Sequence, residues 1–302
     1  MSAAMAGIGI EANGLSLACI ERSGGRPRLV ACEYLAGAPE ERPAQLVQLV
    51  HAHHLKRTRC ATVLSEGDYQ LLLTETPNVS PDELKAALRW KVKDLIDFHI
   101  NDATLDVFDL PGEAKSREMY AVAARNEAIQ KRVDMLTTAG CALEVIDIPE
   151  MAQRNIANLI EQPGRGVALL SFDEQGGLLT VSFEGELYLS RHLDVSWRDL
   201  AGAGADMQQN FFDRITLELQ RSIDHLERQF QFISVNQLWL APLPDAEPLR
   251  AYLAANLYLP VNVLDLNELF DFSRVPALSA PENQVRFFLP LGATLRHEVT
   301  AL

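Results

Sequence analysis

The chain has 302 residues, of which 48% are hydrophobic and 23% charged, and its formal net charge is -14. This length suits about two globular domains, and the acidic balance disfavours a nucleic-acid binder and adsorption to an anionic membrane surface. Four scattered cysteines, no signal-like N-terminus and no apolar run of roughly 18 residues predict a reduced, soluble, intracellular protein.

The first half of the chain mixes strand and helix patterns. Apolar residues alternate over 7–35 with turns at Asn13-Gly14 and at 23–25, which predicts an antiparallel β-meander. Segment 82–98 has helical spacing, and Ser80 and Glu83 form a capping box at its start. The other predicted elements are a helix over 43–55, strands over 60–66, 103–110, 117–124 and 142–148, and helices over 125–140 and 149–160.

The opening pattern recurs over 167–193, which again reads as strand, glycine turn, strand, glycine turn and strand. In this correspondence Gly9 matches Ser171 and Glu11 matches Asp173. A repeat of about 160 residues is too long for a solenoid and predicts two related lobes. The second lobe continues with a helix over 208–231, a strand over 237–243, a helix over 247–257, a strand over 260–266 and a terminal segment over 287–299.

No familiar catalytic or metal motif stands out. The chain contains neither a P-loop nor a G-x-G-x-x-G fingerprint, and its histidines form no Ser/His/Asp or Cys/His arrangement. His51, His53 and His54 are clustered, but their spacing and the cations that follow favour a solvated helix end over a metal site. We therefore predict no catalytic residues and no metal.

Trp90 is the unusual residue of the 82–98 helix. It points away from the apolar stripe of that helix, on the same side as Ala86, Asp94 and Asp97. An aromatic side chain in this position is either covered by another part of the chain or available to a partner. Cover within the chain is the favoured interpretation, and partner contact is the alternative.

Several segments in chain order resemble one known family. They are the opening hairpin, 80–110 with its "SPDELKAALRWKVKDLIDFHIND", 120–155 with its "VIDI", the "RSIDHLERQF" helix and the closing "LPLGATLR". These strings are similar to the actin-like proteins of type IV pilus assembly, the PilM/MshI family, with MshI of MSHA biogenesis as the closer branch. Each string is weak alone, but their common order over about 290 residues makes the resemblance specific.

The resemblance implies an α/β, actin/Hsp70-like (ribonuclease H-like) fold of two lobes. The first lobe is expected over 1–163 with a small subdomain inserted at about 70–143, and the second over 164–302, with the last helix a candidate to return to the first lobe. It further implies a cytoplasmic scaffold at the inner membrane. Such a scaffold binds the cytoplasmic tail of a PilN-like partner and relays to the assembly ATPase. The expected contact residues are Arg89, Trp90, Lys93 and Asp97.

The nucleotide motifs of that family are altered here. Actin-like ATPases place an acid in a D-x-G pattern on each hairpin, but this chain has Gly9-Ile10-Glu11 and Ser171-Phe172-Asp173. The Gly-Gly turn at the adenosine end becomes the proline-rich segment 241–248. By the same correspondence, the degenerate cleft comprises Gly9, Glu11, Asn13, Ser171, Asp173, Gly176 and Ser222.

These changes predict a pseudo-ATPase without a cofactor. Carboxylates at positions 11 and 173 would oppose a polyphosphate, and proline removes backbone donors. Two alternatives stay open. One is a PilM-like switch that binds ATP and Mg through other residues, and the other is the cytoplasmic component of a GspL-like type II secretion system.

Overall fold

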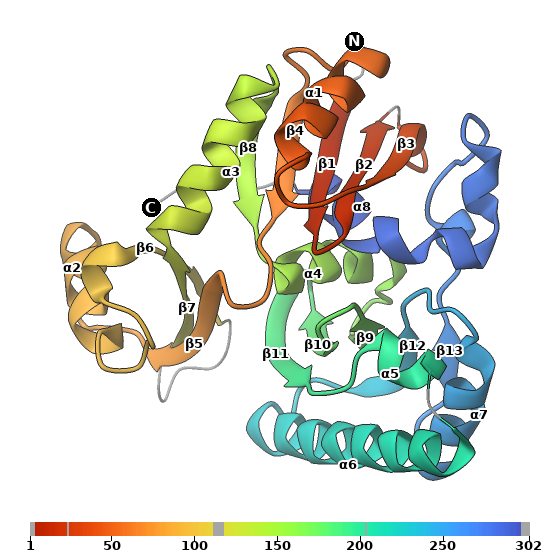
Figure 1. The fold of residues 1–302 in the computed structure, drawn as a ribbon. Coiled ribbons are helices and arrows are strands. Elements are labelled where there is room, and N and C mark those ends of the chain that lie inside the picture. The colour runs from red at the N-terminus through yellow and green to blue at the C-terminus, as the bar shows by residue number, and fades with distance from the viewer. Residues whose placement is uncertain (1–3, 23, 111–117, 203, 297–302) are drawn as a thin grey trace.

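Three β-sheets organise the protein, whose computed structural model describes residues 4–22, 24–110, 118–202 and 204–296 (Figure 1). The first large sheet has the strand order β3-β2-β1-β4-β8 and the second the order β11-β10-β9-β12-β13. The small third sheet has the order β5-β7-β6. In the first sheet the strands are β1 (Ala4–Glu11), β2 (Gly14–Glu21), β3 (Arg28–Ala36), β4 (Arg59–Val63) and β8 (Ala142–Asp147). In the second they are β9 (Gly166–Phe172), β10 (Gly177–Phe183), β11 (Glu186–Leu193), β12 (Val235–Leu240) and β13 (Val261–Val263).

The two large sheets have the same topology. In each, the first strand pairs antiparallel with the second and parallel with the strand that follows the meander, as β1 does with β2 and β4 and β9 does with β10 and β12. A further parallel strand, β8 or β13, completes each sheet. The predicted repeat of a β-meander at the start of two lobes is therefore confirmed.

Helices cover the sheets and join them. Helix α4 is buried along most of its length and contacts the second sheet, while α8 contacts β1, β2 and β4 of the first. These two helices also pack on each other, between the large sheets in Figure 1. The helices are α1 (Arg42–Ala52), α2 (Pro81–Val92), α3 (Asn126–Thr138), α4 (Pro149–Ile160), α5 (Trp197–Gly202), α6 (Ala205–Gln229), α7 (Ala246–Asn256) and α8 (Phe288–Thr294). Short 3-10 helices span Ile100–Asp102, Leu266–Glu268, Pro276–Ser279, Pro281–Asn283 and Val285–Phe287.

The small sheet consists of β5 (Tyr69–Glu75), β6 (Ala103–Asp109) and β7 (Glu118–Arg125). Its strands lie between β4 and β8 in the sequence, and α2 packs on one of its faces through Val92. This order of the three sheets along the chain agrees with the expected two lobes and inserted subdomain. The boundaries at 163–164 and at about 70–143 themselves stay predictions.

The structure differs from the sequence prediction in several local details. The capping box of Ser80 and Glu83 is present, but α2 ends at Val92 instead of continuing to residue 98. Beyond it, the backbone N–H of Asp97 donates to the Gln70 side chain at 2.9 Å, so a tertiary contact takes the place of a further helical turn. Strand β5 was not predicted at all.

The first hairpin turn also lies one residue earlier than expected. Gly14 is the first residue of β2 and pairs with Glu11, which leaves Ala12 and Asn13 as the turn. Gly14 serves close packing instead, because a Cβ atom there would lie 2.2 Å from the carbonyl oxygen of Leu35.

Candidate ligand cleft between the two meanders

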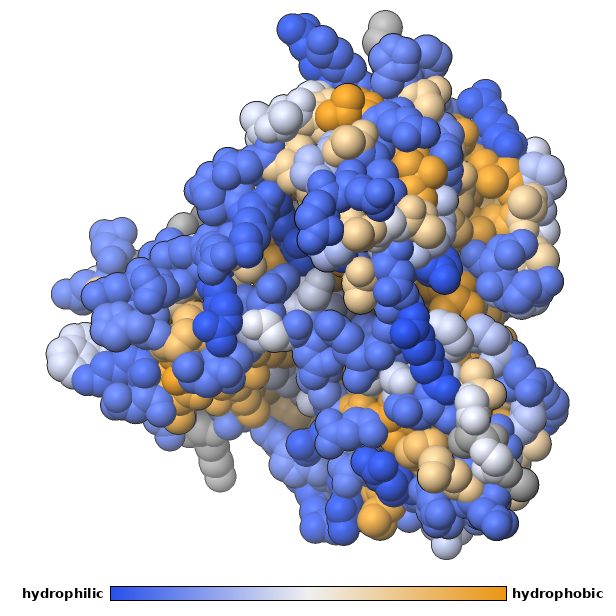
Figure 2. All heavy atoms as spheres, in the orientation of Figure 1, coloured by the Kyte–Doolittle hydropathy of each residue, from blue (hydrophilic) through white to orange (hydrophobic). Residues whose placement is uncertain are grey.

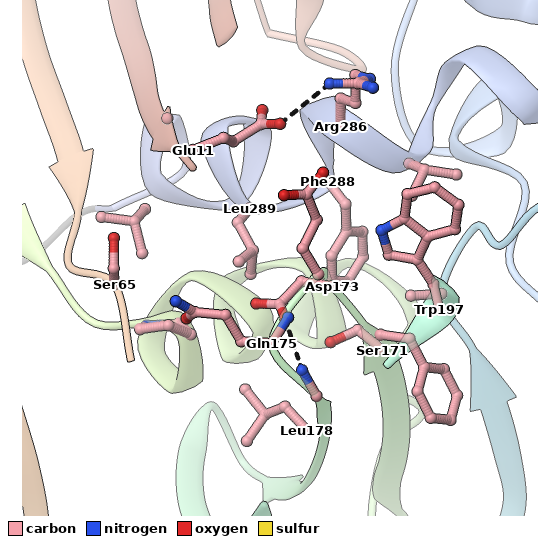
Figure 3. Close-up of a pocket in the computed structure, with 18 of the residues that line it drawn as sticks. Glu11, Ser65, Ser171, Asp173, Gln175, Leu178, Trp197, Arg286, Phe288 and Leu289 are labelled. Carbon is pink, nitrogen blue, oxygen red and sulfur yellow. Dashed lines mark hydrogen bonds and ion pairs between the residues drawn. The ribbon is translucent and has the colours of Figure 1, made fainter. Parts of the chain in front are cut away.

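Two hairpin turns, one from each large sheet, face a common cavity of about 330 Å³ (Figure 3). The cavity, called the cleft below, also has walls from β4, the α4 start, α5, the 241–244 segment and α8. Of the predicted cleft residues, the structure brings five together in its lining. These are Gly9, Glu11, Ser171, Asp173 and Gly176.

Asp173 occupies the backbone donors of its own turn. Its Oδ1 accepts from the N–H groups of Gln175 at 2.7 Å and Gly176 at 2.9 Å. In a phosphate-binding hairpin, such turn N–H groups point at the phosphate oxygens. Here a carboxylate already holds them, and its charge would repel a phosphate at the same place.

Positions 9 and 171, where actin-like ATPases carry metal-orienting acids, do not provide such an acid here. A Cβ atom at Gly9 would lie 2.3 Å from Ser16 Oγ and 3.0 Å from Pro290 Cγ, so an aspartate does not fit without displacement. The hydroxyl of Ser171 donates to Oε1 of the buried Gln153 at 2.6 Å. Neither position presents a carboxylate to the cleft.

Side chains connect the two turns directly. Asn13 Nδ2 donates to Glu174 Oε1 at 2.8 Å and to Oε2 at 3.0 Å, and Arg198 pairs with the same carboxylate at 2.6 Å. Glu11 forms an ion pair with Arg286 at 3.2 Å (Figure 3). Burial raises the pKa of Glu11, and the neighbouring Ser16 hydroxyl and the guanidinium of Arg286 oppose that rise. Asn13 thus lies beside the cleft as a link between the lobes.

Part of the cleft wall is proline-rich. Ala241, Pro242 and Pro244 form part of the wall, and the two prolines offer no backbone N–H. Ser222 does not line the cleft. It is 1% exposed within α6, which packs against β11 on its buried side, so its inclusion in the site was wrong.

The sequence analysis did not predict a network of hydrogen bonds around a buried carboxylate beside the cleft. Glu150, fully buried at the start of α4, accepts a hydrogen bond from the Tyr69 hydroxyl at 2.7 Å. It also lies 3.1 Å from Nε2 of His192, a residue of the cleft wall, and this hydrogen bond raises the pKa of His192. These residues come from β5, α4 and β11, so their sequence positions carried no signal that they meet.

The predicted partner residues lie together at the end of α2, but their side chains differ in solvent exposure and in the contacts that they already make. Trp90 is 72% exposed, and Lys93 Nζ lies 3.6 Å above its ring, so the favoured interpretation of cover within the chain was wrong. Arg89 donates to the Ile100 carbonyl at 2.7 Å, and Asp97 pairs with Arg125 at 2.9 Å. Arg89 and Asp97 therefore support the subdomain, whereas Trp90 faces solvent.

Within the described ranges, no three His, Cys, Asp or Glu side chains converge in a way that could hold a metal ion. All four cysteines are free thiols. None of the helices in the described part of the chain is both long and apolar enough to cross a membrane.

Comparisons with known proteins find one matching family model and several similar structures. Residues 71–173 match the family model described as type IV pilus assembly protein PilM. The fold matches a structure described as the PilM-PilN type IV pilus biogenesis complex, with a TM-score of 0.78, 22% identity and 98% of each chain covered. The chain is thus similar to PilM over residues 71–173 and shares the fold of this structure. The narrower assignment to MshI is considered below as a proposal.

Two further structures share this fold. The cytoplasmic domain of EpsL, an inner-membrane component of the type II secretion system of Vibrio cholerae, matches with a TM-score of 0.50 and 14% identity, covering 80% of this chain and 84% of that one. A Bacteroides thetaiotaomicron protein with an actin-like ATPase fold matches with a TM-score of 0.50 and 9% identity, covering 92% and 96%. The predicted actin-like fold is confirmed. The curated proteins contain no sequence match.

Proposed function

We propose that this protein is a PilM-like cytoplasmic scaffold of a type IV pilus assembly platform, of the MSHA type, that works without hydrolysing ATP. The likeness to the PilM of a PilM-PilN complex supports a PilN-like inner-membrane partner, whose cytoplasmic tail it would bind. The protein would then lie at the inner membrane through that partner. The assembly ATPase is a further candidate partner.

One observation carries the claim that ATP is not hydrolysed. The N–H groups of Gln175 and Gly176, which a phosphate would need, already donate to Asp173. A phosphate would have to displace this carboxylate and then face Glu11 and Glu174 nearby. Like-charge contacts of this kind cost roughly a few kcal/mol each in a partly buried site.

Isothermal calorimetry with Mg-ATP tests this part of the proposal. We expect no saturable heat up to millimolar Mg-ATP and no rise in melting temperature, because a ligand stabilises a protein only when it binds the folded state. Saturable binding would instead favour the ATP-binding switch. A matched titration with the Asp173→Ala variant tests whether the occupied turn is the obstacle, since removal of the carboxylate frees both N–H groups.

Trp90→Ala tests the partner surface. Because Trp90 is 72% exposed, its loss should leave the free energy of unfolding within about 0.5 kcal/mol of the wild type. We expect capture of a PilN-like tail peptide to weaken by about tenfold or more, as for an exposed aromatic at the centre of an interface. Tyr258→Ala, which removes a fully exposed aromatic from the other lobe, is the matched control and should bind normally. Equal capture by both variants would remove Trp90 from the docking surface.

A further inference from the structure

Two of the free cysteines, Cys60 and Cys141, meet at one end of the first large sheet. Cys60 belongs to β4, and Cys141 directly precedes β8, which pairs with β4 in parallel. The register sets Cys60 opposite Leu143. Because side chains alternate between the two faces of a sheet, Cys141, two positions before Leu143, lies on the same face as Cys60. Both cysteines accordingly pack in the hydrophobic cluster that this face forms with α1 and α3.

The turn at the end of α3 holds Cys141 in this place. Helix α3 packs beside β8, as Figure 1 shows. It ends at Gly140, whose φ of 84° is left-handed and whose N–H donates to the Thr137 carbonyl at 3.0 Å. The N–H of Cys141 donates to the Leu136 carbonyl at 3.0 Å, which completes the usual pair of bonds at a helix end of this kind. The Gly140 carbonyl accepts from the N–H of Arg57 at 2.9 Å, so backbone contacts hold the turn against the start of β4.

The two thiols differ in acidity and in exposure. A hydrogen bond between them raises the pKa of Cys60, which burial raises further, and lowers the pKa of Cys141. Cys60 is fully buried, whereas Cys141 is partly exposed. Cys32 is also partly exposed, but burial of its thiol raises its pKa to about 12. Because the thiolate is the nucleophilic form of cysteine, Cys141 is the thiol of the pair that reacts first.

We infer that Cys60 and Cys141 form a redox-active dithiol, which hydrogen peroxide oxidises reversibly to a disulfide. In the first step the Cys141 thiolate attacks one peroxide oxygen, the O–O bond breaks, and the leaving hydroxide takes up the proton that Cys141 released. Sγ of Cys60 then attacks the sulfenic acid on Cys141, so that the S–S bond forms and the S–O bond breaks. The proton of Cys60 goes to the departing hydroxide. The two sulfurs together lose two electrons, and the peroxide is reduced to two molecules of water.

The surroundings of the pair suit a reversible bond. The paired register of β4 and β8 begins at Arg59 and Ala142, so Cys141 lies outside it, in the turn, where the backbone can adjust to the geometry that a disulfide requires. The disulfide would close a loop that contains the small sheet, α2 and α3. Within a reducing compartment such disulfides are transient and serve redox sensing.

Peptide mapping of the full chain after treatment with a small molar excess of hydrogen peroxide tests the inference. We expect a Cys60–Cys141 linked peptide pair, the loss of two of the four thiols and their recovery after dithiothreitol. Cys19 and Cys32 are the internal control, because they lie on the neighbouring strands β2 and β3 and should stay reduced. Cys32 is paired with Ala18, so it points to the face opposite to that of Cys19 and cannot bridge to it.

Variants separate the roles of the two thiols. In Cys60→Ala the sulfenic acid on Cys141 should persist and be trapped by dimedone, whereas the control Cys32→Ala should still form the disulfide. In the wild type at pH 7, iodoacetamide should modify Cys141 about tenfold or more faster than Cys32, because the thiolate fraction falls tenfold for each unit of pKa. Four free thiols after peroxide, a disulfide between any other pair, or equal alkylation of Cys141 and Cys32 would overturn the inference. The mapping and the alkylation use the wild-type chain, so a variant that fails to fold does not weaken the test.

Discussion

Gly292→Ala is expected to lower the free energy of unfolding by about 3 kcal/mol, as overpacking of a close-packed interior does. Gly292 lies where α8 crosses α4, and a Cβ atom there would lie 2.1 Å from the carbonyl oxygen of Ala152. The Ala152 oxygen belongs to a helix backbone and a Cβ position is fixed by its own backbone, so no side-chain rotation relieves the clash. The helices would have to separate, which would also strain the hydrogen bond of 3.0 Å from Asn155 Nδ2 to the Gly292 carbonyl.

Urea unfolding followed by circular dichroism measures this effect. Gly202→Ala is the matched control, because a Cβ atom at Gly202 in α5 meets no atom within 4 Å. The control should be neutral or slightly stabilising, since alanine favours helix by up to about 1 kcal/mol relative to glycine. If both variants unfolded at the wild-type urea concentration, the contact between α4 and α8 would not hold the two large sheets together as described.

Glu150→Ala is expected to cost a similar amount, about 3 kcal/mol, for an electrostatic reason. The substitution leaves the hydroxyl of Tyr69, which is buried, without its acceptor. It also removes the hydrogen bond that holds His192 in place. Because these side chains belong to β5, α4 and β11, their loss loosens the junction between the small sheet and the second large sheet.

The same network predicts a pH dependence with a definite sign. The hydrogen bond to Glu150 raises the pKa of His192 above its ordinary value of 6.5. The stabilisation by protonated His192 is therefore complete below about pH 6.5 and is lost as the pH rises through the raised pKa of the folded state. Unfolding midpoints between pH 5.5 and 8.5 should fall with rising pH in the wild type. They should fall less in His192→Gln, which cannot titrate.

Glu127→Ala serves as the control for Glu150→Ala. Glu127 is exposed, and among the described residues it pairs with Lys131 four residues on, an arrangement worth a few tenths of a kcal/mol. A Glu150→Ala variant as stable as Glu127→Ala, or an unchanged pH profile in His192→Gln, would show that the buried carboxylate does not connect these elements.

Local patterns were sufficient for much of the fold. Alternation over 7–35 and again over 167–193, with glycine turns between the strands, identified both meanders, although β2 and β10 are buried on nearly every residue. Ser80, Pro81 and Glu83 located the start of α2, because capping is an interaction between neighbours in sequence. The pairing of Gly9 with Ser171 and of Glu11 with Asp173 also followed from the repeat. It correctly placed these four residues around one cavity.

Other features depended on contacts between distant segments. The hydrogen bond from Asp97 to Gln70 beyond the end of α2, the exposure of Trp90 and the burial of Ser222 in α6 all depend on the tertiary arrangement. None of these contacts leaves a periodic trace in the sequence.

The sequence by itself determined the repeated lobes and the loss of the acids from both hairpins, because these are properties of residue order and residue type. Only the tertiary structure decided what the exchanged residues do. Asp173 occupies the N–H groups of its own turn, Glu11 pairs with Arg286 from the end of the chain, and Asn13 reaches across to Glu174. Such contacts depend on how two lobes and α8 meet in space. That arrangement is fixed by packing over the whole chain and is not encoded in any single motif.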